Sequence, residues 1–264
     1  MQRQGVKSAL RTFEVLELFR EQRRPLRLNE IYKALSYPQS STTNLLKSMV
    51  MTGYLNYNRK TRVYLPTMRV SDLGNWLPSY IHSDGDLRAL VDKVQRLTDE
   101  TVGIVAQNDL FIQYIMMKTP THEFKAPPAE GDMRLMIDST TGLAMLSRMR
   151  DRTIEKIFRY TRYHHPDMEY FANLDELMRE IRRIRYMGYV YMPNRPTPQL
   201  ASLGMPLDEE MFGIPLALGV GGFHSRIAAR KDALMQIMRD AVAEFRDDYR
   251  ETEQLQGGRG GGCS

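Results

Sequence analysis

The chain has 264 residues, of which 42% are hydrophobic and 26% are charged, and this composition excludes a disordered or fibrous protein. No stretch approaches the roughly 20 apolar residues that span a bilayer, and the first residues lack the pattern of a secretory signal, so we expect a cytoplasmic protein with no membrane partner. The single cysteine, Cys263, excludes an internal disulfide and a multi-cysteine metal site.

Positive charge is concentrated in the first quarter of the chain. Residues 1–72 contain 13 Lys and Arg against 5 Asp and Glu, whereas the remaining residues contain 24 against 27. A basic segment on a near-neutral body favours contact with a nucleic acid or an anionic membrane surface. The alternative is a basic surface that is only solvated.

The first predicted helix covers residues 6–20, where apolar side chains recur at helical spacing. Pro25 follows its end. The apolar side chains at this spacing, which we expect to face the core, are Val6, Leu10, Phe13, Leu16 with Val15, and Phe19.

Two further helices are predicted before residue 53. A short one begins at Asn29, its expected N-cap, and is broken by Pro38. The next covers residues 39–52, with Ser40 or Ser41 as its cap, and Gly53 ends it.

A hairpin is predicted next, with strands at 54–57 and 63–65 joined by the basic turn 58–62. Three helices followed by a hairpin is the order of a winged helix-turn-helix, which we assign to residues 1–68. Residues 69–84 are a predicted linker, helical over 69–82 and interrupted by Pro78.

The remainder, residues 85–252, is predicted to be a second domain of α+β class around an antiparallel sheet. The expected helices are 85–99, 140–150, 152–160, 174–187 and about 230–250, and the expected strands are a hairpin over 102–117 that turns at Asn108-Asp109, then 189–192, 201–207 and 212–220. The Gly-rich tail, 253–264, is expected to be disordered.

The amino-terminal half of the helix 39–52 is the candidate reading element. In helix-turn-helix proteins this end enters the major groove, where hydroxyls and amides reach phosphates and base edges. The alternative is that the two serines only cap the helix. The expected DNA-binding side chains are Gln39, Ser40, Ser41, Thr42, Thr43, Asn44 and Lys47 on the helix, and Arg59, Lys60 and Arg62 on the hairpin.

The sequence resembles the IclR family of bacterial transcriptional regulators. The amino-terminal resemblance rests on Val6-Lys7-Ser8-Ala9-Leu10, Leu28-x-Glu30-Ile31, Pro38-Gln39-Ser40-Ser41-Thr42, Leu45-Leu46 and Gly53-Tyr54-Leu55. Farther along it rests on Ser139-Thr140-Thr141-Gly142-Leu143-Ala144, the run 181–189 ending in Gly188-Tyr189, and Leu203-Gly204-Met205-Pro206-Leu207.

The resemblance implies a GAF-like effector domain, a homodimer or homotetramer, a palindromic operator in double-stranded DNA, and a small organic acid as effector. It implies neither a cofactor nor a metal. The family's ligand positions fall on Thr140, Thr141, Gly142, Ser202, Gly219 and Gly221.

Three of these positions depart from the family's usual residues, because Ser202 stands where the family often has cysteine, and Gly219 and Gly221 stand where it often has serine. The family's acidic residue after the Gly-Tyr strand is also missing from Val190-Tyr191-Met192-Pro193-Asn194. Lost hydroxyls indicate a larger, less polar pocket and a bulkier ligand, such as an aromatic acid. The alternative is that the glycines mark a bend or a bulge.

Three functions are therefore compared. The first is a regulator whose operator affinity responds to the effector. The second is a constitutive regulator whose C-terminal domain only oligomerises. The third, an enzyme with an accessory helix-turn-helix, is the least favoured, because no G-x-S-x-G, P-loop or H-E-x-x-H motif is present.

Overall fold

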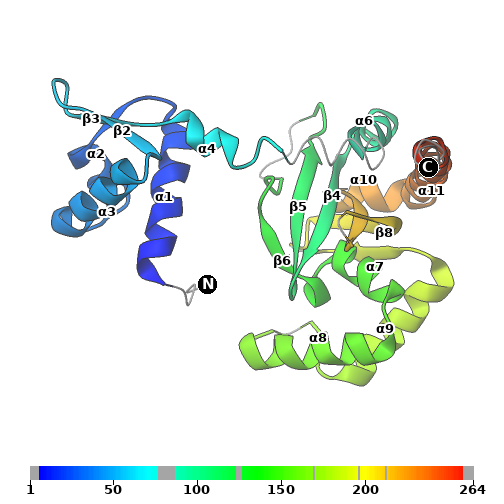
Figure 1. Ribbon diagram of the computed structural model, residues 1–264. Coiled ribbons are helices and arrows are strands. Elements are labelled where there is room, and N and C mark those ends of the chain that lie inside the picture. Colours follow the sequence, from blue (N-terminus) through cyan, green and yellow to red (C-terminus); the bar gives the residue numbers. More distant parts are fainter. Residues whose placement is uncertain are drawn as a thin grey trace, which may run out of the picture. The chain divides into compact units, whose positions relative to one another are not determined.

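The structure is a computed structural model that describes residues 6–76, 87–122, 127–168, 170–195, 197–211 and 213–257, with side chains up to 247 except those of 209–211. The chain divides into two compact units, Met1–Tyr80 and Ile81–Ser264 (Figure 1). Among the described helices, none is both long enough and apolar enough to cross a membrane.

The N-terminal unit is a winged helix-turn-helix. Its three-stranded antiparallel sheet has the order β1-β3-β2, and its core is formed by apolar side chains of α1, α2, α3 and the sheet. Its elements are α1 (Lys7–Gln22), β1 (Leu26–Arg27), α2 (Leu28–Ala34), α3 (Gln39–Met51), β2 (Leu55–Asn58), β3 (Val63–Pro66) and α4 (Met68–Asp72).

The core-facing side of α1 differs from the prediction in part. Val15 and Phe19 are buried as predicted, and Leu18, which was not predicted, is also buried, whereas Val6 and Phe13 are 72% and 66% exposed. The buried and the exposed apolar residues both recur at helical spacing, so periodicity alone did not decide which of two neighbouring faces packs on the core. Packing of α1 against α3 and β3 selects one of them.

The helix starts also differ. Arg27, not Asn29, is the N-cap of α2, because Leu26–Arg27 first pairs with β3 as a short strand. Pro38 is the N-cap of α3, so neither predicted serine caps it. The predicted Gly53 ending is confirmed, since Gly53 has φ +80°, which a glycine adopts without strain.

The C-terminal unit is an α+β domain with a six-stranded antiparallel sheet of order β6-β5-β4-β9-β8-β7. The predicted hairpin is confirmed by the pairing of β4 with β5, and its turn is Asp109-Leu110, one residue later than predicted, because Asn108 pairs with Phe111. The elements are α6 (Leu87–Thr98), β4 (Thr101–Asn108), β5 (Phe111–Lys118), β6 (Met133–Leu135), η1 (Met136–Asp138), α7 (Thr140–Arg148), α8 (Asp151–His164), α9 (Leu174–Met187), β7 (Val190–Pro193), β8 (Leu200–Met211), β9 (Ile214–Phe223), α10 (His224–Ala229) and α11 (Lys231–Gly257).

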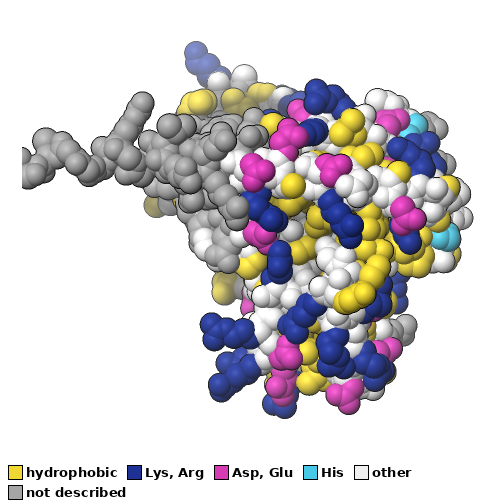
Figure 2. Space-filling view, turned by 90° about the vertical axis from the view of Figure 1, so that its right-hand side faces the viewer, with side chains coloured by type: hydrophobic (Ala, Val, Ile, Leu, Met, Phe, Trp, Pro, Cys, Tyr) yellow, Lys and Arg dark blue, Asp and Glu magenta, His cyan; other side chains and the backbone are white. Residues whose placement is uncertain are grey.

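Helices cover both faces of this sheet, and each face has its own apolar core (Figure 1). One core joins the sheet to α6, α10 and α11, and the other joins it to α7, α8 and α9. Figure 2 shows Lys and Arg side chains interspersed with Asp, Glu and apolar side chains on one side of the molecule.

Two predicted segments are corrected. The predicted linker helix 69–82 is only the short α4, followed by a turn, as far as the described residues reach, and Pro78 lies outside them. The helix α11 continues to Gly257, so residues 253–257 of the predicted disordered tail are helical. Residues 258–264 lie outside the described residues.

Candidate DNA interface and effector site

The helix α3 has a buried face and an exposed polar face. Thr42, Leu46 and Met49 are buried at helical spacing. The opposite face presents exposed Gln39, Ser40, Asn44 and Lys47, with half-buried Ser41 and Thr43 beside them. The exposed face therefore carries amides, a hydroxyl and a cation that can reach DNA.

Thr42 is the exception among the predicted reading residues. Its side chain is 1% exposed, and its hydroxyl donates to the carbonyl of Pro38 at 3.0 Å. We assign Thr42 to the core of the domain rather than to the DNA face. The hydroxyls of Ser41 and Thr43 also donate to the carbonyls of Pro38 and Gln39, at 3.0 and 2.8 Å, and the Oγ of Ser41 accepts from Arg11 of α1 at 3.5 Å.

The wing turn is shaped by Asn58. Its side-chain oxygen accepts from the amides of Lys60 and Thr61 at 2.9 and 3.1 Å, as in an Asx turn. Arg62 then has φ 55°, an uncommon conformation for a residue other than glycine. This turn leaves Arg59, Lys60 and Arg62 exposed to solvent, as predicted.

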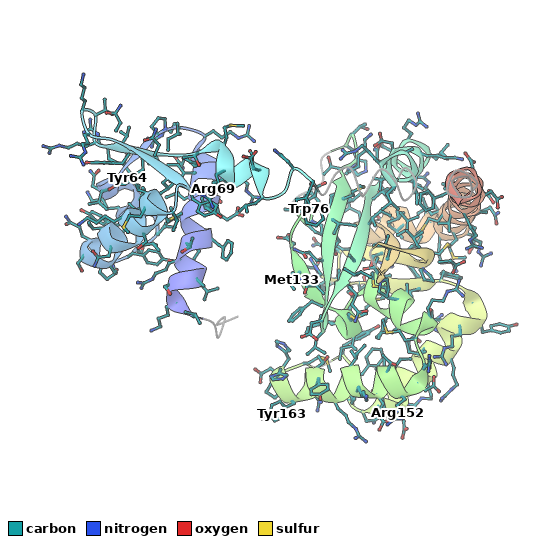
Figure 3. All side chains as sticks on the ribbon, viewed as in Figure 1. Tyr64, Arg69, Trp76, Met133, Arg152 and Tyr163 are labelled. Carbon is teal, nitrogen blue, oxygen red and sulfur yellow. The ribbon has the colours of Figure 1, made fainter. Side chains whose placement is uncertain are left out.

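Aromatic packing holds the wing strands together. Tyr57 on β2 and Tyr64 on β3 are directly paired, and their ring centroids lie 4.7 Å apart (Figure 3). Burial raises the pKa of Tyr64. The wing is therefore anchored at its base, while its tip stays open.

A groove of about 550 Å³ lies between the wing tip and the starts of α2 and α3. Three cations line it, and Arg27 was not predicted as a DNA contact. Arg27 could have been suspected from the sequence, because it is a basic residue at the start of a helix. Tyr32 carries no comparable signal. The lining residues are Arg27, Leu28, Asn29, Tyr32, Gln39, Lys60, Thr61 and Arg62.

Glu30 fixes the start of α2 beside this groove. Its carboxylate accepts from the backbone amide of Arg27 at 2.8 Å and from Arg24 at 2.7 Å. These hydrogen bonds lower the pKa of the Glu30 carboxyl, the backbone contribution being the larger. At the start of α2 this carboxylate is thus engaged by Arg24 and by a main-chain amide.

In the C-terminal unit, the predicted effector residues meet where α7 begins. Ser139, which the sequence analysis did not single out, is the N-cap and accepts from the amide of Gly142 at 3.1 Å. Thr140 and Thr141 are buried, and the hydroxyl of Thr140 is hydrogen-bonded to that of Ser202 on β8. Chain segments far apart in sequence are thus joined at one end of α7.

The glycines of the sheet have two different roles. A Cβ at position 219 would lie 2.8 Å from the methyl carbon of Thr141, and one at 204 would lie 2.8 Å from the carbonyl oxygen of Thr140. At these two positions the absence of a side chain allows α7 to pack closely on the sheet. The extra pocket space that we predicted is therefore absent at Gly219. A Cβ at position 221 would meet nothing closer than 3.8 Å.

The glycine run is regular strand. Residues 219–222 pair without a shift in register, and the irregularities of this sheet lie between Ile104 and Val105 and between Pro206 and Glu210. The alternative of a bend or bulge at the run is therefore wrong.

Comparison with known proteins agrees with both units. Residues 8–59 match the IclR helix-turn-helix domain, and residues 86–245 match the domain described as bacterial transcriptional regulator IclR C-terminal. The HTH-type transcriptional regulator XynR of Escherichia coli K12 is 20% identical over 226 residues, which are 84% of this chain and 88% of that protein.

Solved structures show the same fold. The IclR transcriptional regulator of Alicyclobacillus acidocaldarius has a TM-score of 0.62 at 18% identity, over 91% of this chain and 98% of that one. An IclR homologue of Microbacterium hydrocarbonoxydans, complexed with 4-hydroxybenzoate, has a TM-score of 0.67 at 16% identity, over 92% and 99% of the two chains. The chain belongs to the IclR family of bacterial transcriptional regulators.

Proposed function

We propose that this regulator reads an operator with the exposed face of α3 while the α2–wing groove holds the phosphate backbone. The observation that carries the proposal is the groove itself, in which Arg27, Lys60 and Arg62 surround the start of α3. Lys and Arg side chains can neutralise DNA phosphates, and the amides and hydroxyls of α3 can hydrogen-bond to base edges. The bound macromolecule is double-stranded DNA.

We further propose that a small organic molecule, bound between α7 and the sheet, changes operator affinity. Support comes from the start of α7, where main-chain amides without a preceding helix carbonyl favour an acid. Such control requires that the ligand bind two arrangements of the protein with different affinity. The compound 4-hydroxybenzoate, which the Microbacterium homologue binds, is a suitable first probe.

One observation favours the constitutive alternative. The first turn of α7 fills the space above Gly204 and Gly219, so at Gly219 the predicted ligand surface is closed by the protein itself. Titration with 4-hydroxybenzoate and benzoate separates the two functions. The ligand-controlled function requires that one acid both bind and change operator affinity, and the constitutive function requires that neither does.

We also infer that the chain acts as a homodimer or homotetramer on a palindromic operator, as its family membership suggests. A two-fold protein binds half-sites about one helical turn, 34–36 Å, apart, or at multiples of that distance. Mass photometry of the chain on its selected DNA tests this. A single chain bound per operator contradicts it.

Selection of duplexes from random sequence tests DNA reading directly. We expect an enriched motif that is bound at least about a thousandfold more tightly than competitor DNA at the same ionic strength. Equal affinity for selected and random duplexes would contradict the proposal.

The groove predicts the salt dependence of binding. We expect Arg27→Ala and Lys60→Ala each to weaken binding to all sequences and to flatten the plot of log affinity against log salt by about 0.9, the value for one phosphate. The control is Arg152→Ala, an exposed cation of the other unit (Figure 3). A slope that stays the same in the groove variants removes their phosphate role.

Asn44 predicts base preference. Its side chain is exposed on the reading face, and an asparagine can form two hydrogen bonds with adenine. We expect Asn44→Ala to cost about 1–3 kcal/mol at one operator position and to relax preference there. Lys47→Ala is the matched variant, since we expect it to weaken binding to all DNA sequences alike. If Asn44→Ala selects the same motif as the parent chain, Asn44 does not contact a base.

A further inference from the structure

One row of residues crosses four strands of the C-terminal sheet beside the start of α7. Thr101 on β4 pairs with Gly221 on β9, which pairs with Ser202 on β8, which pairs with Met192 on β7. Residues directly opposite one another in an antiparallel sheet share a face. Ser202 touches Thr140 of α7, so the whole row faces α7.

The row is covered differently from its neighbour. In the next row, Gly103, Gly219 and Gly204 are paired, and α7 reaches the last two closely enough to exclude a methyl group. At Gly221 the nearest atoms to a Cβ would be the carbonyl oxygen of Ala201 and the Cβ of Ser202, at 3.8 and 3.9 Å. Both belong to the sheet, so no described atom of α7 lies within 4 Å of a Cβ at this position.

Thr101 brings an unsatisfied polar group to this row. The side chain is 5% exposed, and its Oγ1 is buried with no hydrogen-bond partner among the residues that the structure describes. Buried hydroxyls are paired in the large majority of cases, because an unmade hydrogen bond is costly. Rotation about χ1 exchanges the hydroxyl and methyl positions of a threonine, so the same side chain can present its oxygen in another rotamer.

The other hydroxyl of the row is already engaged. Ser202 is hydrogen-bonded to Thr140, and Gly221 has no side chain. At the far end, Met192 is buried and apolar. The row therefore offers one hydrogen-bond donor, Thr101, beside one open position, Gly221.

We propose that Thr101 is the hydrogen-bonding residue that selects the effector. Its hydroxyl donates to an acceptor oxygen of a carboxylate or carbonyl lying above Gly221. The inference rests on the proposed effector site and adds a residue and a ligand orientation to it. A hydrogen bond to the ligand would also remove the energetic cost of the unpaired Thr101 hydroxyl in the ligand-free protein.

Thr101→Val tests this with two opposite effects. Valine has the same shape without the hydroxyl, so we expect the Tm of the ligand-free chain to rise by about 2–4 °C, since an unpaired buried group is removed. We expect affinity for 4-hydroxybenzoate or benzoate, measured by calorimetry on the full chain, to fall about tenfold.

Thr161→Val is the matched control, because Thr161 is fully buried but its hydroxyl donates to Ile157 at 2.7 Å. That variant should show no rise in Tm and no change in ligand affinity. A fall in Tm for Thr101→Val, or equal affinity of this variant and the parent chain for the acid, overturns the assignment, as does a parent chain that binds neither acid. An acid could bind with an affinity that Thr101→Val lowers and yet leave operator affinity unchanged. That result would contradict control by the ligand but support the role of Thr101 in binding it.

Discussion

Glu100→Ala is expected to destabilise the C-terminal unit by about 3 kcal/mol, near the lower end of the range for breaking a buried ion pair. Glu100 is fully buried, and its Oε1 accepts from Arg226 at 2.8 Å and lies 3.7 Å from Arg230. Both arginine side chains are 40% exposed, so water partly replaces the lost carboxylate and places the loss at that end of the range.

The Tm of the unfolding transition should fall by about 6–12 °C for a unit of this size. Glu155→Ala is the control, since its pair with Arg159 is more exposed and should contribute about 1 kcal/mol or less. Equal losses in the two variants, measured by calorimetry on the full chain, would show that burial of Glu100 adds nothing.

Gly142→Ala is the second change with a large expected effect. Alanine is favoured over glycine within a helix by about 1 kcal/mol. Here a Cβ would lie 2.1 Å from the carbonyl oxygen of Met136 and 2.5 Å from the Oγ of Ser139, the cap of α7. Backbone must move and the cap hydrogen bond is lost, so we expect a net loss of about 2 kcal/mol or more.

Gly221→Ala is the control within the same domain, because its Cβ would meet nothing closer than 3.8 Å. The difference between the two variants should be about 4–8 °C in Tm. If Gly142→Ala is as stable as Gly221→Ala, the first turn of α7 is not fixed by the close approach described above.

The winged helix-turn-helix was predictable because its signals are local. Pro38, Gly53 and the polar turn after Asn58 end or reverse the chain wherever they stand. The strand β1 was missed because a two-residue strand has no period of its own and depends on pairing with β3. The face of α1 was misassigned for a related reason, since packing partners decide between two neighbouring apolar stripes.

The effector site was predicted only in part. Its residues could be located by resemblance, but the sequence does not show how closely α7 approaches the sheet. That distance makes Gly219 a packing glycine and leaves Gly221 open. Thr101 could not be found in advance, because a hydroxyl lacking a partner is recognised only when its neighbours are in place.

The two outermost strands of the large sheet, β6 and β7, are short. They have three and four residues, against eight to twelve in the strands between them, and Pro193 in β7 has no amide hydrogen to donate. Each outer strand therefore offers few main-chain groups for a foreign strand to join. Addition of a foreign strand along β6 or β7 is disfavoured in the folded domain.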